Sequence, residues 1–283
     1  MQSKKLIFNS DDFGYSAAFN EGIKRGFESG VLTSTCILAN GEAFDEAVSM
    51  LKNDIPEIGL GVHLNIIEGK SLTNCPLLTG EDGCFNNGYL KMILNSSNSE
   101  YLKQIEIEFR AQIEKTKSVL EVDHINSHVH THAIPQIFEL TCKLAREYGI
   151  KAVRTQLELP YFIPDIKKHL TLKYPINLVK NLLLNSFSIK NKPLAKKYKL
   201  LTNDYLIGVT YTGYMDEDAV ICGLKAILKS GSVSEILIHP TYFSSDEHIL
   251  KPFNYQEYLI TQSETINEKI TELGFQLTNY KNI

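Results

Sequence analysis

Carboxylate and imidazole side chains recur in this chain at the ends of apolar segments, and both groups bind divalent metal ions. One carboxylate and two imidazoles would hold a cation and leave coordination positions open for water and substrate. Such a ligand count is typical of a catalytic metal site rather than a structural one. The residues concerned are Asp11, Asp12, His63, His128, His130 and His132.

Asp11 and Asp12 are adjacent after an apolar run, and Gly14 permits a tight turn behind them. Neighbouring residues at a strand end point in different directions, so one carboxylate can bind a metal while the other acts as general base on water. The alternative is a turn or a helix N-cap pair ahead of the helical pattern at 16–29. These residues alone leave both readings open.

His63 lies between Leu60 and Leu64 in an apolar segment. A single histidine there is more often a hydrogen-bonded core residue than a metal ligand. Asn65 and Glu68 follow in the adjoining loop, where they could orient the imidazole or meet substrate hydroxyl groups.

His128, His130 and His132 alternate along the chain, which in an extended segment would point all three imidazoles to one side. We expect one to bind metal, one to support that ligand and one to contact substrate. A zinc finger is not expected, because no cysteine pair accompanies the histidines.

Arg154 and Glu158 follow another apolar segment, and His239 ends a later one. The arginine could pair with a carboxylate of the site and lower its pKa, or form an ordinary salt bridge. A histidine at a strand end could serve as general acid towards a leaving group.

These side chains need a scaffold that gathers strand ends, and the hydrophobic pattern predicts one. Strands are expected at 5–9, 32–38, 59–64, 124–127, 152–154, 205–209 and 235–239, and helices at 16–29, 42–52, 100–120, 135–148, 217–229 and 256–273. Alternating strands and helices indicate parallel β/α units, and a β/α barrel collects its strand ends at one mouth. An open doubly wound sheet would bring fewer ends together.

The chain has 283 residues, of which 43% are hydrophobic and 22% charged, so we expect a single domain over 1–283. A lysine-rich helical insertion is expected around 165–200, either as a solvated helical face or as a basic lid. The net charge of −4 gives no general reason to bind nucleic acid. The first apolar run is too short for membrane insertion, and five cysteines without a CxxC pattern favour the cytoplasm.

Assembled in order, these motifs resemble the YdjC/ChbG family of carbohydrate deacetylases, which includes chitooligosaccharide and hopanoid-biosynthesis deacetylases. The matching segments are Asn9–Gly14, Gly61–Asn65 with Glu68 and Gly69, Ser127–His132, Val153 and Arg154 with Glu158, Gly208, and His239 with Pro240. The resemblance implies an α/β fold, a (β/α) barrel, incomplete or distorted, that is related to polysaccharide deacetylases. It also implies one divalent metal ion, Mg²⁺ or Zn²⁺, and a homodimer.

The same resemblance implies roles for individual residues in removing an acetyl group from an N-acetylated sugar or oligosaccharide. Metal ligands would be Asp12, His63 and His128; Asp11 would be the general base, oriented by Arg154, and His239 the general acid; substrate contacts would come from Asn65, Glu68, His130, His132 and Glu158. Two positions depart from the family pattern. Asn126 replaces the common Asp, which should weaken the orientation of His128, and Thr241 replaces the common Gly, which should narrow the mouth.

Two other functions fit parts of the sequence. A metal-dependent phosphoester hydrolase could use the same ligands, but it would be expected to add phosphate-binding arginines or a glycine-rich loop, and the chain has only four arginines. A carbohydrate-binding protein without catalysis would suit the 14 tyrosines and 13 phenylalanines. The paired aspartates and the absence of tryptophan argue against it.

Overall fold

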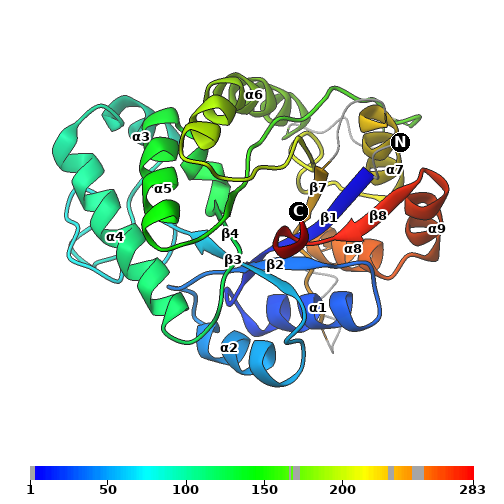
Figure 1. The fold of residues 1–283 in the computed structure, drawn as a ribbon, viewed down its shortest axis with the longest axis horizontal. Coiled ribbons are helices and arrows are strands. Elements are labelled where there is room, and N and C mark those ends of the chain that lie inside the picture. The colour runs from blue at the N-terminus through cyan, green and yellow to red at the C-terminus, as the bar shows by residue number, and fades with distance from the viewer. Residues whose placement is uncertain (1–3, 166, 168–172, 229–232, 244–251) are drawn as a thin grey trace.

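The computed structural model describes residues 4–165, 167, 173–228, 233–243 and 252–283. Its sheet has the strand order β5-β4-β3-β2-β1-β7-β6, with β8 paired to β1, and every ladder is parallel. The strands are β1 (Lys4–Phe13), β2 (Ser34–Ile37), β3 (Gly59–Leu64), β4 (His124–Ser127), β5 (Ala152–Val153), β6 (Tyr205–Ile207), β7 (Val233–Ile238) and β8 (Phe275–Thr278). The sheet curls into an incomplete (β/α) barrel, which confirms the expected fold class (Figure 1).

The helices follow the strands along the chain and cover the outside of the curled sheet (Figure 1). They are α1 (Ala17–Glu28), α2 (Phe44–Asn53), α3 (Tyr89–Asn95), α4 (Ser99–Lys117), α5 (Pro135–Glu147), α6 (Lys173–Lys197), α7 (Glu217–Ile227), α8 (Pro252–Thr261) and α9 (Glu264–Glu272), with 3₁₀ turns η1 (His128–Ala133) and η4 (Tyr280–Asn282). None of the helices in the described part of the chain is long and apolar enough to span a membrane.

All seven predicted strands are present, but some other elements differ from the prediction, among them helix α3, which was not predicted. The helix expected at 256–273 is two helices, because the Ser263 side chain accepts from the amide of Ile266 and starts α9 afresh. Strand β8 was missed because only Phe275 of its residues is buried, so it gives no apolar run. Strand β8 pairs with the first half of β1, and β2 pairs with the second half.

The expected insertion around 165–200 is represented by the long helix α6; residues 166 and 168–172 of that prediction lie outside the described residues. Asn181, Leu184 and Ser188 are buried on its inner side. Ile176, Val179 and Leu182 are exposed on the same helix. The helix therefore packs on the barrel through a narrow mixed stripe.

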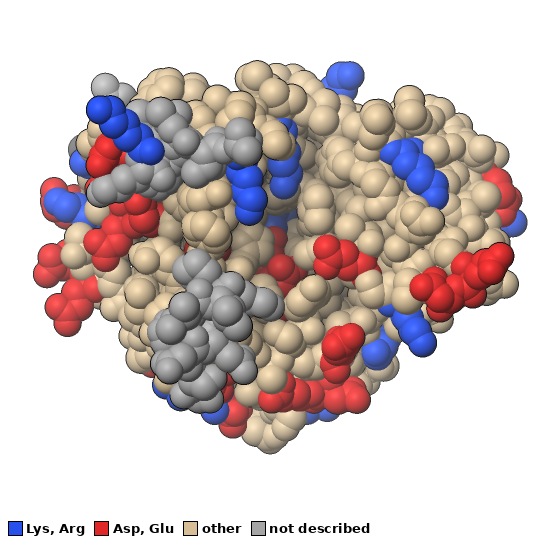
Figure 2. All heavy atoms as spheres, turned by 180° about the vertical axis from the view of Figure 1, so that it is seen from behind, with Lys and Arg blue, Asp and Glu red and all other residues tan. Residues whose placement is uncertain are grey.

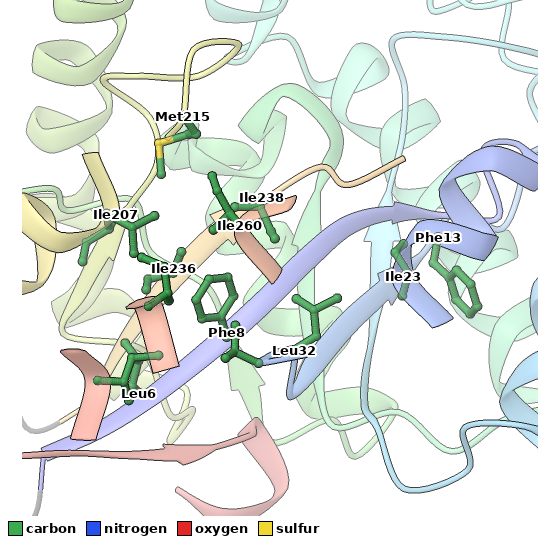
Figure 3. Close-up of a cluster of buried hydrophobic side chains, with 14 of the residues drawn as sticks. Leu6, Phe8, Phe13, Ile23, Leu32, Ile207, Met215, Ile236, Ile238 and Ile260 are labelled. Carbon is green, nitrogen blue, oxygen red and sulfur yellow. The ribbon is translucent and has the colours of Figure 1, made fainter. Parts of the chain in front are cut away.

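Side chains along β1 alternate between two environments, the hydrophobic core under the helices and the interior of the half-barrel. Leu6 and Phe8 pack with Ile236 and Ile238 of β7 in the main hydrophobic cluster (Figure 3). Each such buried side chain stabilises the fold by roughly 1.5–3 kcal/mol. Residues of opposite parity face inward, and this places Asp11 inside the half-barrel.

Candidate metal centre

The three predicted metal ligands converge at the carboxyl ends of β1, β3 and β4. Oδ1 of Asp12 lies 3.2 Å from Nε2 of His63 and 2.8 Å from Nδ1 of His128. The candidate ligand atoms of the three residues all lie within 4.8 Å of one another. One carboxylate oxygen and two imidazole nitrogens form a donor set that fits a divalent cation, and the two imidazoles suit zinc better than magnesium.

The backbone of β1 turns the two aspartates apart. Register with β2 shifts between Ser10 and Phe13, and Asp12 adopts a left-handed conformation with φ 69°. Aspartate tolerates this region better than most residues because its short side chain bonds locally. Asp11 consequently points into the barrel, whereas Asp12 points to its mouth.

A hydrogen bond fixes which nitrogen of His63 faces Asp12. Nδ1 of His63 lies 2.6 Å from Oδ1 of Asn126, whose Nδ2 in turn donates to Asp11 at 3.0 Å. Because the amide oxygen can only accept, the proton sits on Nδ1 and the lone pair of Nε2 is directed to the candidate metal position. Asn126 was expected to affect His128; it supports His63 instead.

Acidic and basic side chains at the mouth of the site shift one another's pKa values. Burial alone would raise the pKa of Asp12, but the imidazoles of His128 and His63 hold it well below its usual range. Burial likewise opposes charging of His128, yet Asp12 and Glu68 raise its pKa to about 10. A proton held between Asp12 and His128 would therefore compete with a cation for the same place.

Asp11 is bound by both arms of a buried arginine. Nη1 of Arg154 donates to Oδ2 at 2.7 Å and Nη2 donates to Oδ1 at 2.8 Å. Burial would raise the pKa of Asp11, but the Arg154 charge holds it well below its usual range. Cys36 adds a thiol contact to Oδ1 at 2.9 Å. Asp11, Cys36 and His63 also form a metal-sized cluster, but the adjacent guanidinium would repel a cation there.

His239 is held at the end of β7 by Glu257. Its backbone amide donates to Oε2 of Glu257 at 2.5 Å, and its Nδ1 lies 3.3 Å from the same oxygen. Burial opposes protonation of His239, but Glu257 and the two aspartates raise its pKa. Gly22 permits the close approach of this turn to α1, because a Cβ there would lie 2.7 Å from the carbonyl oxygen of Pro240.

Thr241, expected to narrow the mouth, is 1% exposed and packs under the turn. The backbone amide of Thr241 donates to the carbonyl oxygen of Asn254, and the narrowing of the mouth stays a prediction.

Asn65 and Glu68 line a pocket of about 230 Å³, whose lining residues Glu68 and Tyr15 also contact His128. Oε2 of Glu68 lies 3.7 Å from Nε2 of His128, and the hydroxyl of Tyr15 donates to the same oxygen at 3.3 Å. The Tyr15 ring stacks on His128 at a centroid distance of 6.4 Å. Asn65 uses its amide to hold the loop, donating to the carbonyl of Glu68 at 2.8 Å.

His130 and His132 are not brought to the metal ligands. The segment after β4 is a 3₁₀ turn with left-handed Val129 and His130, at φ 52° and 59°, so the expectation of an extended segment was wrong. His132 is fully buried, with Nδ1 2.6 Å from the Ser127 hydroxyl and Nε2 3.1 Å from the Arg154 carbonyl. Burial lowers its pKa to about 3.

His130 is 5% exposed, and its Nδ1 has no hydrogen-bond partner among the described residues. Burial, followed by the charge of Lys180, holds the pKa of His130 well below its usual range. Lys180 comes from α6, so the lysine-rich segment places one lysine near His130.

Glu158 is buried and all its contacts are internal. Its carboxylate accepts from the amides of Gly208 and Thr210 at 2.7 and 2.8 Å, and from the side chain of Asn181. These bonds tie the loop after β6 to α6. Glu158 therefore supports this loop, and it is not among the residues that line the pocket beside Asn65 and Glu68.

Several residues of the site were missed from the sequence. Four residues contact a predicted site residue, but no sequence motif links either member of each pair to the other. They are Tyr15, Cys36, Glu235 and Glu257. Only the position of Glu235 within an apolar strand run is an unusual feature, since a buried carboxylate requires a partner. Figure 2 shows a hollow near the middle of one face, with acidic atoms at its bottom and basic side chains on its wall.

Comparisons with known proteins identify similar chains. A family model described as YdjC-like protein matches residues 5–272. The chain is 30% identical to a carbohydrate deacetylase of Clostridium beijerinckii over 99% of this chain and 100% of that protein. It is 37% identical to a chitooligosaccharide deacetylase of Salmonella paratyphi B over 51% of this chain and 57% of that protein.

A similar fold occurs in the crystal structure of a proposed cellobiose-phosphate cleavage protein from Enterococcus faecalis V583. The TM-score is 0.76 at 24% identity, covering 99% of this chain and 98% of that one. At this identity the likeness establishes the fold.

Proposed function

This chain belongs to the YdjC-like protein family, and we propose that it is a metal-dependent hydrolase that removes the acetyl group of an N-acetylated carbohydrate and releases acetate. The substrate class is a chitooligosaccharide or a related amino sugar. The observation that carries this proposal is the convergence of Asp12, His63 and His128, with His63 oriented by Asn126. Relatives named carbohydrate deacetylases support the reaction class.

The proposed centre would be held by Asp12, His63 and His128. A divalent cation bound there, Zn²⁺ or Mg²⁺, would act as a Lewis acid towards the acetamido carbonyl and lower the pKa of a water molecule. Asn126 would keep the Nε2 lone pair of His63 directed inward throughout.

Asp11 would accept the proton of the attacking water, and Arg154 would keep its carboxylate charged and in place. A lowered pKa makes Asp11 a weak base, so Asp11 could take the proton only from a water molecule that the bound cation had already acidified. His239, whose pKa both aspartates raise, would protonate the departing amine. Glu257 would hold the imidazole during this transfer.

The sugar would lie in the pocket beside the centre. Tyr15 offers a ring that is 40% exposed, and Glu68 offers a carboxylate to hydroxyl groups. His130 is retained as a proposed substrate contact because its Nδ1 has no partner in the described part of the chain. His132 and Glu158 would act by supporting the backbone around Arg154 and Thr210.

The test compares three functions in one protein preparation. Wild type, chelated protein and chelated protein with Zn²⁺ restored are assayed for acetate release from diacetylchitobiose and for cleavage of a nitrophenyl phosphate ester, while circular dichroism monitors folding. Acetate release that disappears on chelation and returns with Zn²⁺ supports the proposal. Phosphate release alone would favour the phosphoesterase, and sugar binding without either product would favour a binding protein.

A further inference from the structure

A continuous line of buried polar contacts crosses the interior of the half-barrel from the last turn of the chain to Asp11. The Tyr280 hydroxyl donates to Oε2 of Glu235 at 2.6 Å. Oε1 of Glu235 accepts from Nε of Arg154 at 2.9 Å, and also from its Nη2. The other edge of the Arg154 guanidinium binds Asp11. No side chain in this line is more than 3% exposed.

Tyr280 is placed by packing as well as by its hydroxyl. Its ring stacks on His124 of β4 at a centroid distance of 4.2 Å and an angle of 20°. It clusters with Ile7 of β1 and Ala152 of β5. The turn η4 thus inserts one aromatic ring between strands from both halves of the sheet.

Arg154 has two buried carboxylates to satisfy, and its orientation depends on both. Glu235 holds one edge of the guanidinium only while its own carboxylate is fixed, and the Tyr280 hydroxyl occupies its remaining oxygen. If Glu235 turned, Arg154 would follow it and loosen its bidentate contact with Asp11. Asp11 anchors Asn126, and Asn126 orients His63, so the effect would reach a proposed metal ligand.

We infer that Tyr280 is a positioning residue for the metal centre, acting through Glu235, Arg154 and Asp11. It touches neither the ligand residues nor the pocket, so its effect is on geometry. The inference rests on the proposed metal centre, but it does not depend on which reaction that centre performs.

The test uses the full-length protein with Tyr280→Phe, which keeps the stacked ring and removes only the hydroxyl. Tyr101→Phe is the matched control, because Tyr101 is also buried and its hydroxyl donates to Asn87 at 3.0 Å, outside this line of contacts. The dissociation constant for Zn²⁺ alone is measured by titration calorimetry, and kcat and KM are measured for acetate release at saturating Zn²⁺.

For Tyr280→Phe we expect the Zn²⁺ dissociation constant to rise about fivefold, and kcat to fall about tenfold with KM changed less than twofold. Tyr101→Phe should change none of the three, although both variants lose stability. Equal Zn²⁺ affinities in wild type, Tyr280→Phe and Tyr101→Phe would overturn the inference. If wild type binds Zn²⁺ but releases no acetate, the proposed function fails while the affinities still decide this inference.

Should Tyr280→Phe not fold, Glu235→Gln provides the second variant. The amide is neutral and removes the negative charge that pairs with Arg154 (Glu235 Oε1 accepts from its Nε at 2.9 Å), so the guanidinium is held less firmly and the Zn²⁺ dissociation constant should again rise severalfold. Glu106→Gln is its control, since Glu106 is a carboxylate that pairs with Arg110 at 2.8 Å and takes no part in this line of contacts. Unchanged Zn²⁺ affinity in Glu235→Gln would contradict the inference.

Discussion

Asn126 accepts the Nδ1 proton of His63 at 2.6 Å, and this contact turns the opposite nitrogen of the imidazole towards Asp12, 3.2 Å away. The same amide donates to Asp11 at 3.0 Å. A neutral amide can donate to one neighbour and accept from the other, which a charged carboxylate cannot. Asn126 therefore links the buried aspartate to the candidate metal ligand without adding charge.

Asn126→Ala should raise the Zn²⁺ dissociation constant by about 10- to 100-fold, because His63 loses the bond that fixes its ring and tautomer. Calorimetric titration with Zn²⁺ measures this change. Asn203→Ala is the control: Asn203 is also fully buried and bonds Thr155, but it contacts none of the proposed ligands. Equal affinities in the two variants would refute the role of Asn126.

Asp12→Asn should abolish Zn²⁺ binding in the micromolar range and lower acetate release by at least about 100-fold, because the only anionic ligand of the set is lost. Asp82→Asn, at an exposed loop position, provides the charge-matched comparison. A variant at Asp12 that kept both the metal and full activity would exclude this site.

Glu257→Gln should move the alkaline limb of the kcat profile to lower pH. Burial lowers the pKa of His239, and Glu257 is the strongest influence that raises it. A general acid acts in its protonated form. If the pKa of His239 falls, His239 loses its proton, and the activity declines, at a lower pH. The pH profile of acetate release measures the shift, and an unmoved alkaline limb would mean that His239 is not the acid.

His132 should make stability depend on pH below neutrality. Its pKa is about 3 in the folded protein against 6.5 in the unfolded chain, so the unfolded state binds the proton first as the pH falls. Stability contributed by neutral His132 is therefore complete above pH 6.5 and is lost progressively towards pH 3. Below about pH 6 the slope is about 1.4 kcal/mol per pH unit for one proton.

Urea unfolding of wild type and His132→Gln between pH 6 and pH 4.5 measures that contribution. The variant should be less stable at neutral pH. Its free energy of unfolding should fall less steeply with decreasing pH, by about 1.4 kcal/mol per pH unit, which is the slope for one proton. Parallel slopes would show that His132 does not stay neutral in the folded state.

Residue types and the strand-helix alternation predicted parallel β/α units whose polar strand ends could converge, and the resemblance to the deacetylase family selected the barrel and the set of Asp12, His63 and His128. Each lies at or just beyond the carboxyl end of a parallel strand, where topology determines the neighbourhood. The orientation of the histidines after β4 was not predictable in the same way. It depends on a left-handed backbone at Val129 and His130. A β-branched residue such as valine rarely adopts this conformation, and the hydrophobic periodicity of the sequence does not indicate it.

Contacts between distant segments were also missed. Glu235 and Tyr280 meet Arg154 from β7 and from the last turn of the chain, and nothing in their spacing indicates this. Buried charges select their partners in three dimensions, so a single sequence shows only that a carboxylate within an apolar strand must have one.

The most direct measurement is acetate release from N-acetylated mono- and disaccharides, including diacetylchitobiose, by Zn²⁺-supplemented protein, with the free amine quantified in parallel. The account predicts acetate and amine in equal amounts from wild type, and neither product from Asp11→Asn or Asp12→Asn. Release by wild type and both variants alike, or no release from any sugar by Zn²⁺-loaded wild type, would contradict it.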